Sequence, residues 1–162
     1  MARNDAQQPV PASRVMAFEA FKAGRYMEAE SHARKLVDGS PDSDFAWKLL
    51  GAVLLHQHRT VEALVALQHA NALTPADSEV AAYLGATWLQ IGDLERARTE
   101  LERSARLCPE HWEAHHNLGV VLSELGRLDE ARQAFERARV FNPEIAGASA
   151  NFPNSSQQAR AL

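Results

Sequence analysis

The sequence predicts an all-α protein, a solenoid of about eight antiparallel helices arranged as four helix pairs. The main observation is a constant interval of 34 residues between four prolines: Pro41, Pro75, Pro109 and Pro143. The same interval separates four alanines and three glycines: Ala29, Ala63, Ala97, Ala131, Gly51, Gly85 and Gly119. A fixed period of this length indicates supersecondary units that stack on one another.

The second unit shows which elements each repeat contains. Trp47, Leu50 and Leu54 recur at helical spacing and form one apolar stripe. After a break, a second stripe of the same kind occupies residues 63–73. Pro75 ends the second helix, because the residue before a proline is displaced from helical backbone angles. We therefore expect each unit to fold as two antiparallel helices joined by a short turn.

Small residues mark two further features of the repeat. Glycine stands at the turn between the helices in three units, at Gly24, Gly92 and Gly126. Glycine adopts a positive φ there at little cost, so His58, which takes this place in the second unit, is expected to strain or reshape its turn. The periodic alanines and glycines are expected where the two helices of a pair cross closely, since larger side chains would push them apart.

The units resemble tetratricopeptide repeats, whose consensus runs W-x2-L-G-x2-Y, then A-x3-F, then P. The matching residues of the second unit are Trp47, Leu50, Gly51, Leu54, Ala63, Leu67 and Pro75. Those of the fourth unit are Leu118, Gly119, Leu122, Ala131, Phe135 and Pro143. The resemblance covers about residues 10 to 145 and implies a right-handed α-solenoid whose first helices line a concave surface that binds peptides or proteins.

Domain boundaries follow from the repeats and from composition. We expect a flexible N-terminal segment over residues 1–11, a repeat domain over 12–145, and a polar tail over 146–162 that is disordered or extended. The repeats themselves are expected at about 10–43, 44–77, 78–111 and 112–145.

Composition narrows the location and the partners. The net charge of −4 argues against nucleic acid as the main ligand, because phosphate binding needs a basic surface. A single cysteine, Cys108, excludes an intrachain disulfide and favours a reducing compartment. The sequence shows neither an apolar signal region nor an apolar stretch long enough to span a membrane. We therefore expect a cytoplasmic protein without membrane insertion.

The resemblance also assigns groove-lining positions to the first helix of each pair. The residues expected to contact a partner are Phe18, Phe21, Phe45, Lys48, Leu49, Leu55, Glu79, Tyr83, Leu89, Glu113, His116 and Asn117. This set is largely apolar and aromatic in the first three units, and a solvent-facing apolar patch of that size marks an interaction site. The expected function is therefore a non-catalytic adaptor, scaffold or chaperone-like module that captures an apolar segment of a partner.

Two alternatives remain open at this stage. No helix is expected to cap the fourth unit, so the protein could self-associate through Phe135, Ala138, Phe141 and Ile145 and form an oligomeric scaffold. The opening repeats also resemble those of bacterial proteins with a C-terminal glycosyltransferase or sulfotransferase domain. This second resemblance implies an N-terminal part that recruits the substrate of a larger enzyme.

Catalytic motifs are missing from the sequence. It has no glycine-rich phosphate loop and no nucleophile elbow, so we expect neither an enzyme nor a cofactor. Cys108, His111 and His115 are spaced closely enough to suggest zinc or copper. The preferred interpretation is structural, since Cys108 lies at a repeat boundary and His115 takes the place of a packing residue, and no metal is expected.

Overall fold

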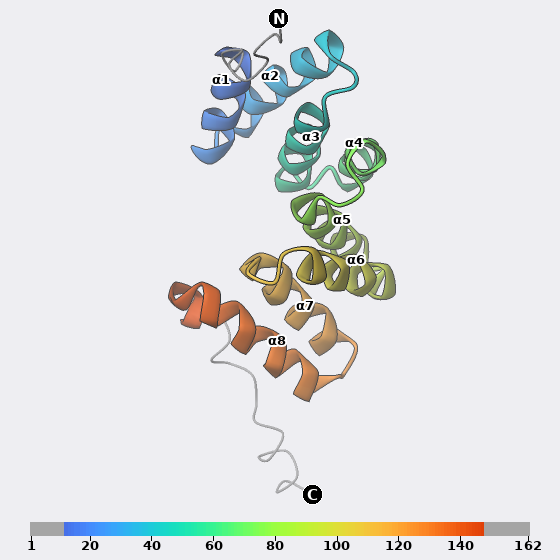
Figure 1. Ribbon diagram of the computed structural model, residues 1–162, viewed down its shortest axis with the longest axis vertical. Helices are drawn as coiled ribbons and strands as arrows, with labels where there is room; N and C mark the ends of the chain where they lie inside the picture. Colours follow the sequence, from blue (N-terminus) through green and yellow to red (C-terminus); the bar gives the residue numbers. More distant parts are fainter. Residues whose placement is uncertain (1–11, 148–162) are drawn as a thin grey trace, which may run out of the picture. The chain divides into compact units, whose positions relative to one another are not determined.

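The computed structural model describes residues 12–147. This part consists of eight α-helices and one short 3-10 helix, and no strand occurs in it (Figure 1). The helices are α1 Ala12–Lys22, α2 Tyr26–Gly39, α3 Asp44–His56, α4 Thr60–Leu73, α5 Ser78–Ile91, α6 Leu94–Leu107, α7 Trp112–Glu124, α8 Leu128–Phe141 and the 3-10 helix η1 Pro143–Gly147. The prediction of an all-α fold with four helix pairs is confirmed.

The chain forms two compact units of two helix pairs each. Unit 1 comprises Met1–Thr74 and holds α1 to α4, whereas unit 2 comprises Pro75–Leu162 and holds α5 to α8 and η1. In unit 1, α1 packs on α2 and α3 on α4, and α2 joins the two pairs by packing on α3. Unit 2 repeats this arrangement, with α6 packed on α7.

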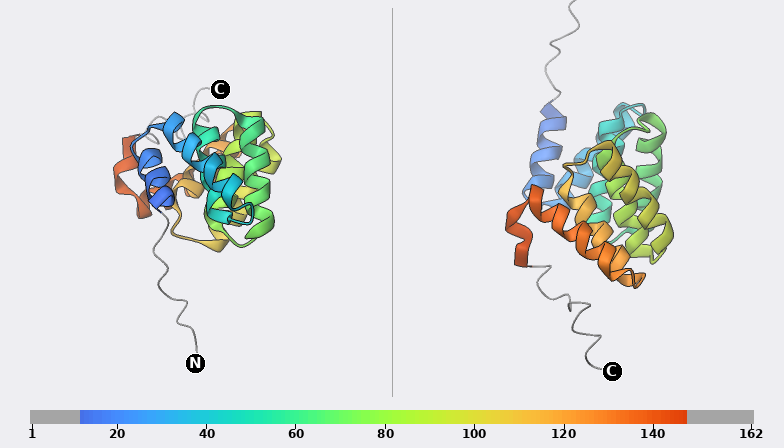
Figure 2. Two further views of the ribbon diagram at one scale, coloured as in Figure 1. Left: turned by 90° about the horizontal axis from the view of Figure 1, so that it is seen from above. Right: turned by 60° about the horizontal axis from the view of Figure 1, so that its bottom comes forward.

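The structure tests only part of the expected domain boundaries. Residues 1–11 and 148–162 lie outside the described part, so the expected flexible N-terminal segment and the expected tail stay predictions. The 3-10 helix η1 packs on α8 and continues from its end (Figure 2). Because η1 extends to Gly147, regular structure runs into the segment that the sequence assigns to the tail. No helix within residues 12–147 is both long and apolar enough to cross a bilayer.

Polar side chains fix where three of the helices begin. The Ser43 hydroxyl accepts a hydrogen bond from the Ala46 amide at 3.2 Å at the start of α3. The Asp77 carboxylate accepts from the amides of Glu79 and Val80, at 2.8 and 3.2 Å, at the start of α5. At the start of α6, the Asp93 carboxylate accepts a hydrogen bond from the Arg96 amide at 3.0 Å. These N-caps satisfy amides that would otherwise have no partner in the first turn of the helix.

Close helix crossings in both units depend on a missing Cβ atom. A Cβ added to Gly51 would lie 2.5 Å from Leu67 Cγ, and one added to Gly85 would lie 2.5 Å from Leu101 Cγ. At Gly119 the same atom would lie 2.7 Å from the Phe135 ring. The predicted close crossing is confirmed, but the side chain that fills each gap stands four residues after the periodic alanine.

Positive backbone angles occur where the sequence predicts them. Gly24, Gly92 and Gly126 have φ of 72°, 89° and 76°, and His58 has φ of 59°. His58 therefore keeps the left-handed geometry that glycine provides in the other units, although its Cβ makes this conformation less favourable. The expected strain at this turn is confirmed in the sense that a non-glycine residue holds a positive φ.

We predict that Gly51→Ala lowers the free energy of unfolding by about 1 to 2 kcal/mol. Overpacking costs ~1–3 kcal/mol, and the better helix propensity of alanine returns less than ~1 kcal/mol. The measurement is urea unfolding followed by circular dichroism. Gly39→Ala is the matched control, because a Cβ at Gly39 has no atom within 4 Å. Equal stability of the two variants would contradict the packing argument.

A substitution at His58 should change the free energy of unfolding in the opposite direction to Gly51→Ala. His58→Gly should raise the free energy of unfolding by ~0.5 kcal/mol, because relief of ~1 kcal/mol of left-handed strain exceeds the added entropy of the unfolded chain. The reverse substitution, Gly126→His, should destabilise the protein at the equivalent turn of unit 2. The same urea titration measures both, and a shift of both variants in one direction would refute this account of the turn.

Candidate functional site

Unit 1 presents a face formed by α1 and α3, the α1–α3 face. The Arg14 guanidinium lies 4.2 Å from the centre of the Phe45 ring, so the first turns of the two helices are in contact. At their other ends, the Phe21 ring meets His56 edge-on with 5.4 Å between ring centres. The two helices therefore run parallel and side by side, as the equivalent helices of successive repeats should.

An aromatic cluster closes one end of the α1–α3 face. The rings of Tyr26 and His56 stack with centres 5.0 Å apart, and the Tyr26 hydroxyl lies 3.5 Å from His56 Nδ1. Phe21 packs against both rings. Burial, together with the nearby charge of His58, lowers the pKa of His56. The imidazole is therefore neutral at neutral pH and serves as an aromatic surface.

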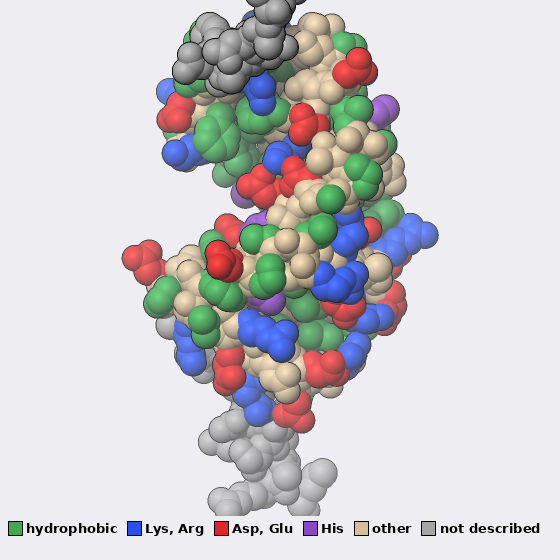
Figure 3. All heavy atoms as spheres, in the orientation of Figure 1, with side chains coloured by type: hydrophobic (Ala, Val, Ile, Leu, Met, Phe, Trp, Pro, Cys, Tyr) green, Lys and Arg blue, Asp and Glu red, His purple; other side chains and the backbone are tan. Residues whose placement is uncertain are grey.

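The rest of this face exposes large apolar side chains. Val15 and Phe18 of α1 are 50% and 43% exposed. Figure 3 shows hydrophobic side chains gathered over α1. The Lys22 ammonium lies 5.6 Å from the centre of the Phe18 ring, so a cation borders the apolar surface. Among the residues predicted from the sequence, Phe21, Phe45 and Lys48 are half-buried on α1 and α3.

The expectation that Leu49 and Leu55 face solvent is wrong. Their side chains are only 4% and 6% exposed. The helix α3 packs against α1, α2 and α4, so buried residues surround most of it rather than forming one stripe. Both leucines belong to the core that supports the α1–α3 face. An Asp at either position would bury a carboxylate and would unfold the unit rather than report on binding.

The predicted groove residues of unit 2 lie on α5 and α7, which pack on each other. Glu79 and Glu113 are exposed, and the other four are half-buried: Tyr83, Leu89, His116 and Asn117. The ring of His116 meets Phe135 edge-on at 5.4 Å, and burial lowers the pKa of His116. Part of the His116 side chain is therefore engaged by α8 of its own helix pair.

Two of the predicted self-association residues are already covered. Phe135 is 6% exposed and Ala138 is fully buried. Phe135 fills the space that Gly119 leaves open, so α7 covers it within the same pair and a following repeat is not required. Phe141 remains 44% exposed and Ile145 is half-buried. The prediction that Phe135 and Ala138 lack cover is wrong.

A pocket that the sequence analysis did not anticipate lies on unit 2. Residues of α6, α7 and α8 line it, and its volume is about 490 Å³. Leu118 and Phe141 contribute apolar surface, and Arg106 and Arg137 also line it. No motif marks this pocket, because its residues come together only when the second helices of two successive repeats pack beside the same first helix.

The side chains of His111 and His115 have other partners in the structure. His115 donates from Nε2 to the Pro109 carbonyl at 2.8 Å, and His111 Nδ1 lies 3.2 Å from the Ser104 hydroxyl. Cys108 is half-buried and unbridged. Within residues 12–147, no group of three or more His, Cys, Asp or Glu side chains converges in a way that could hold a metal ion.

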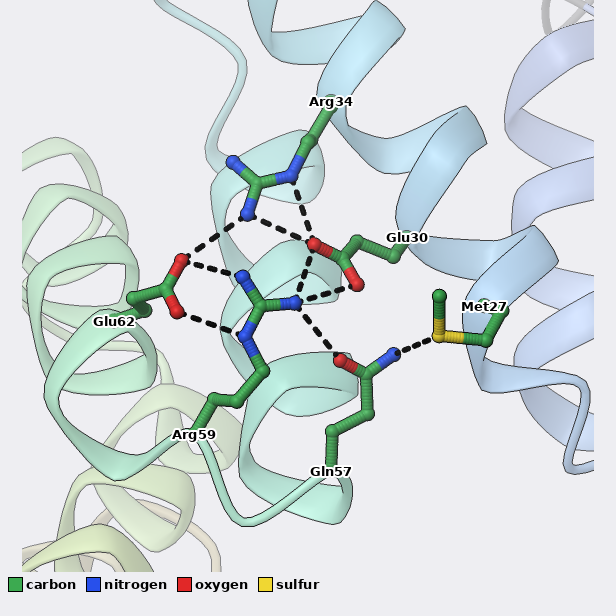
Figure 4. A network of polar contacts seen from close by, with 6 residues as sticks. All are labelled: Met27, Glu30, Arg34, Gln57, Arg59 and Glu62. Atoms are coloured by element: carbon green, nitrogen blue, oxygen red, sulfur yellow. Dashed lines mark hydrogen bonds and ion pairs between the residues drawn. The ribbon is translucent and has the colours of Figure 1, made fainter.

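Unit 1 also contains a network of charged side chains centred on Glu30 (Figure 4). Glu30 is only 7% exposed, and Arg59 donates to its two carboxylate oxygens at 2.7 and 2.8 Å. Arg34 donates to Glu30 at 2.9 Å, and Arg59 also forms two hydrogen bonds with Glu62. The network joins α2, the turn after α3, and α4. Its charges are mutually neutralised, so we interpret it as structural rather than catalytic.

The pKa of Glu30 reflects this environment. Burial raises the pKa of the carboxyl, but hydrogen bonds from Arg59, Arg34 and Gln57 outweigh burial and leave the pKa below its ordinary value. The hydrogen bond from Arg59 likewise lowers the pKa of Glu62. Both carboxylates are therefore ionised at neutral pH and remain paired.

Comparison with known proteins decides the family. The family model described as tetratricopeptide repeat matches residues 16–78 and 88–149, which is most of the chain. The chain belongs to the tetratricopeptide repeat family. The resemblance predicted from the periodic residues is thereby confirmed. No curated protein matches this tetratricopeptide repeat chain.

Solved structures of tetratricopeptide repeat proteins share the fold. A crystal structure of MamA is 22% identical with a TM-score of 0.71, over 86% of this chain and 81% of that one. The first repeat domain of Spaghetti (RPAP3), solved with the HSP90 peptide SRMEEVD, is 23% identical with a TM-score of 0.67, over 71% and 91%. An O-GlcNAc transferase mutant from Thermobaculum terrenum is 27% identical with a TM-score of 0.67, over 75% of this chain and 25% of that one.

We predict that Arg59→Ala destabilises the tetratricopeptide repeat chain more than Arg127→Ala. Removal of Arg59 leaves the nearly buried Glu30 carboxylate with weaker pairing, and an under-paired buried charge is costly. Arg127 is the N-cap residue of α8 as Arg59 is of α4, but Arg127 forms its ion pair with the exposed Glu130. Thermal unfolding of both variants is the measurement, and a larger loss for Arg127→Ala would refute the role of the network.

The same network predicts an acid dependence. A carboxyl with a lowered folded-state pKa contributes stability that is fully present above its ordinary pKa of 4.5 and is lost as the pH falls through the lowered value. The difference in melting temperature between the wild type and Arg59→Ala should therefore shrink on acidification from neutral pH to about pH 3. A difference that stays constant over this range would show that Glu30 contributes through packing and not through charge.

Proposed function

We propose that this chain is a non-catalytic protein-interaction module that binds a partner segment on the α1–α3 face of unit 1. The main evidence is the exposure of Val15 and Phe18 on α1, with the Lys22 ammonium close to the Phe18 ring. Exposed aromatic and aliphatic side chains gain free energy when a partner buries them, whereas neighbouring charges set orientation. An apolar segment with an acidic flank fits this face.

The comparisons support the mode of binding. The similar repeat domain of Spaghetti (RPAP3) was solved with a bound peptide, which shows that helix pairs of this kind hold a peptide in that protein. In this chain we assign the apolar contact to Phe18, Phe21 and Phe45, with Lys48 as a polar contact at the edge. Arg14 and Lys22 stand close to two of these rings.

Unit 2 offers a second set of contacts on α5 and α7. We propose that Tyr83 and Leu89 provide apolar surface there, and that the side chains of Glu79, Glu113 and Asn117 fix the register of a bound segment. The net charge of −4 and the lone cysteine fit a module that binds protein rather than nucleic acid and works in the cytoplasm.

Self-association is the second candidate. Val140 and Phe141 at the end of α8 are 73% and 44% exposed, so an apolar patch remains there although Phe135 and Ala138 are covered. The similarity to a quarter of an O-GlcNAc transferase chain supports the other alternative, recruitment of a substrate for a larger enzyme. Light scattering of the wild type and Val140→Asp tests self-association. The coding sequence that follows residue 162 in the source gene tests whether the chain is part of a larger enzyme.

We predict that Phe18→Asp abolishes capture of the main partner. The tagged chain is incubated with lysate of the source organism, and retained proteins are identified by mass spectrometry. Val61→Asp is the matched control, because Val61 is 73% exposed on α4 and lies on neither α1 nor α3. A partner retained by the wild type and by Val61→Asp, but at least ~10-fold reduced with Phe18→Asp, supports the proposal. Equal retention by all three proteins would exclude the α1–α3 face.

A further inference from the structure

The pocket on α6, α7 and α8 of unit 2 is large enough to hold a large side chain. Its volume of about 490 Å³ lies within the range of ligand pockets in proteins. Leu118 and Phe141 line it, together with Ala105 and Pro109. A side chain that entered the pocket would therefore be surrounded mainly by apolar atoms.

The wall of the pocket is held in place by contacts within unit 2. The His115 ring stacks on Phe141 with 6.2 Å between ring centres, and Nε2 of His115 donates to the Pro109 carbonyl. His115 is only 5% exposed, so its ring is fixed between α7 and α8. The pocket is thus formed before any partner arrives, which lowers the entropic cost of binding.

Two arginines give the pocket a positive charge. Arg106 of α6 and Arg137 of α8 line it, and neither has an ion-pair partner within residues 12–147. Glu102 also lines the pocket, but Arg98 binds its carboxylate at 3.0 Å. Arg98 in turn bridges to Glu95, which is typical of the arginines on these helices. Two unpaired guanidinium groups beside an apolar pocket therefore favour an anionic group near an apolar one.

We propose that this pocket binds an acidic peptide segment of a partner protein, with one bulky apolar side chain inside the pocket and neighbouring carboxylates paired with Arg106 and Arg137. The site lies on α6 and α8 of unit 2 and is separate from the α1–α3 face, so the inference goes beyond the function proposed above. Charge also argues against the chain's own C-terminal residues as the occupant. Residues 148–162 contain Arg160 and no Asp or Glu.

The test is an array of nine-residue peptides, each with a central leucine, phenylalanine or tryptophan between glutamates, and each matched by a peptide with glutamines instead. Binding to the full chain is measured by fluorescence anisotropy. We expect some glutamate peptides to bind and their glutamine partners to bind roughly 10-fold more weakly or not at all. Binding should also weaken as the salt concentration rises.

Three variants locate the site. The double variant Arg106→Glu, Arg137→Glu should lose binding, and so should Ala105→Trp, which fills the pocket without changing charge. The matched control is Arg139→Glu, since Arg139 is exposed on α8 and does not line the pocket; it should leave binding unchanged. All three are made in a Phe18→Asp background, with Phe18→Asp alone as their reference, so that binding at the α1–α3 face of unit 1 does not contribute to the signal. Circular dichroism verifies that each variant is folded.

Four results would overturn the proposal. The first is that no glutamate peptide binds, and the second is that the glutamine peptides bind equally well. The third is that Arg139→Glu weakens binding as much as the double variant does. The fourth is binding only after deletion of residues 148–162, or only when light scattering shows a dimer dissociating, because the occupant would then be the chain's own tail or a second copy.

Discussion

The missing Cβ atoms at Gly51, Gly85 and Gly119 are the constraint on which the rest of the structure depends. They let the first helix of each of these pairs approach the second closely enough for one large side chain to fill the gap. Leu67 and Leu101 are fully buried there, and the fourth pair uses the Phe135 ring. With this packing, each pair becomes a rigid support, and the helix faces that point away from it are free to bind.

The first helix pair, α1 and α2, is attached to the second pair by different interactions. The buried residues of α2 are Ala29, Glu30 and Ala33, so this helix buries little apolar surface. The network of Glu30, Arg34, Arg59 and Glu62 ties α2 to α4 by charge instead. Such a network fixes geometry well but adds less stability than an apolar core, because desolvation offsets much of the Coulomb attraction. In the same pair, α1 leaves Val15 and Met16 exposed.

Both proposed sites place a cationic side chain beside apolar surface, although they lie on different helices. The α1–α3 face places Lys22 near the exposed Phe18 ring, and the pocket of unit 2 places Arg106 and Arg137 near Leu118 and Phe141. In each case a cation borders apolar surface, although the whole chain carries a net charge of −4. Local arrangement rather than net charge therefore defines what each surface attracts. A partner with apolar anchors and acidic flanks would satisfy both.

The sequence by itself determined the helix pairs, their turns and their family, since proline, glycine and alanine act through the local backbone and recur every 34 residues. It also placed Phe18, Phe21 and Phe45 on the correct helices. Only the tertiary structure decided which side chains are covered. Leu49 is buried because α3 has neighbours on three sides, and Phe135 is buried because it fills the gap at Gly119. The pocket lined by Arg106 and Arg137 also became visible only in the tertiary structure. Its residues come together through contacts between helices of successive repeats, which no single repeat encodes.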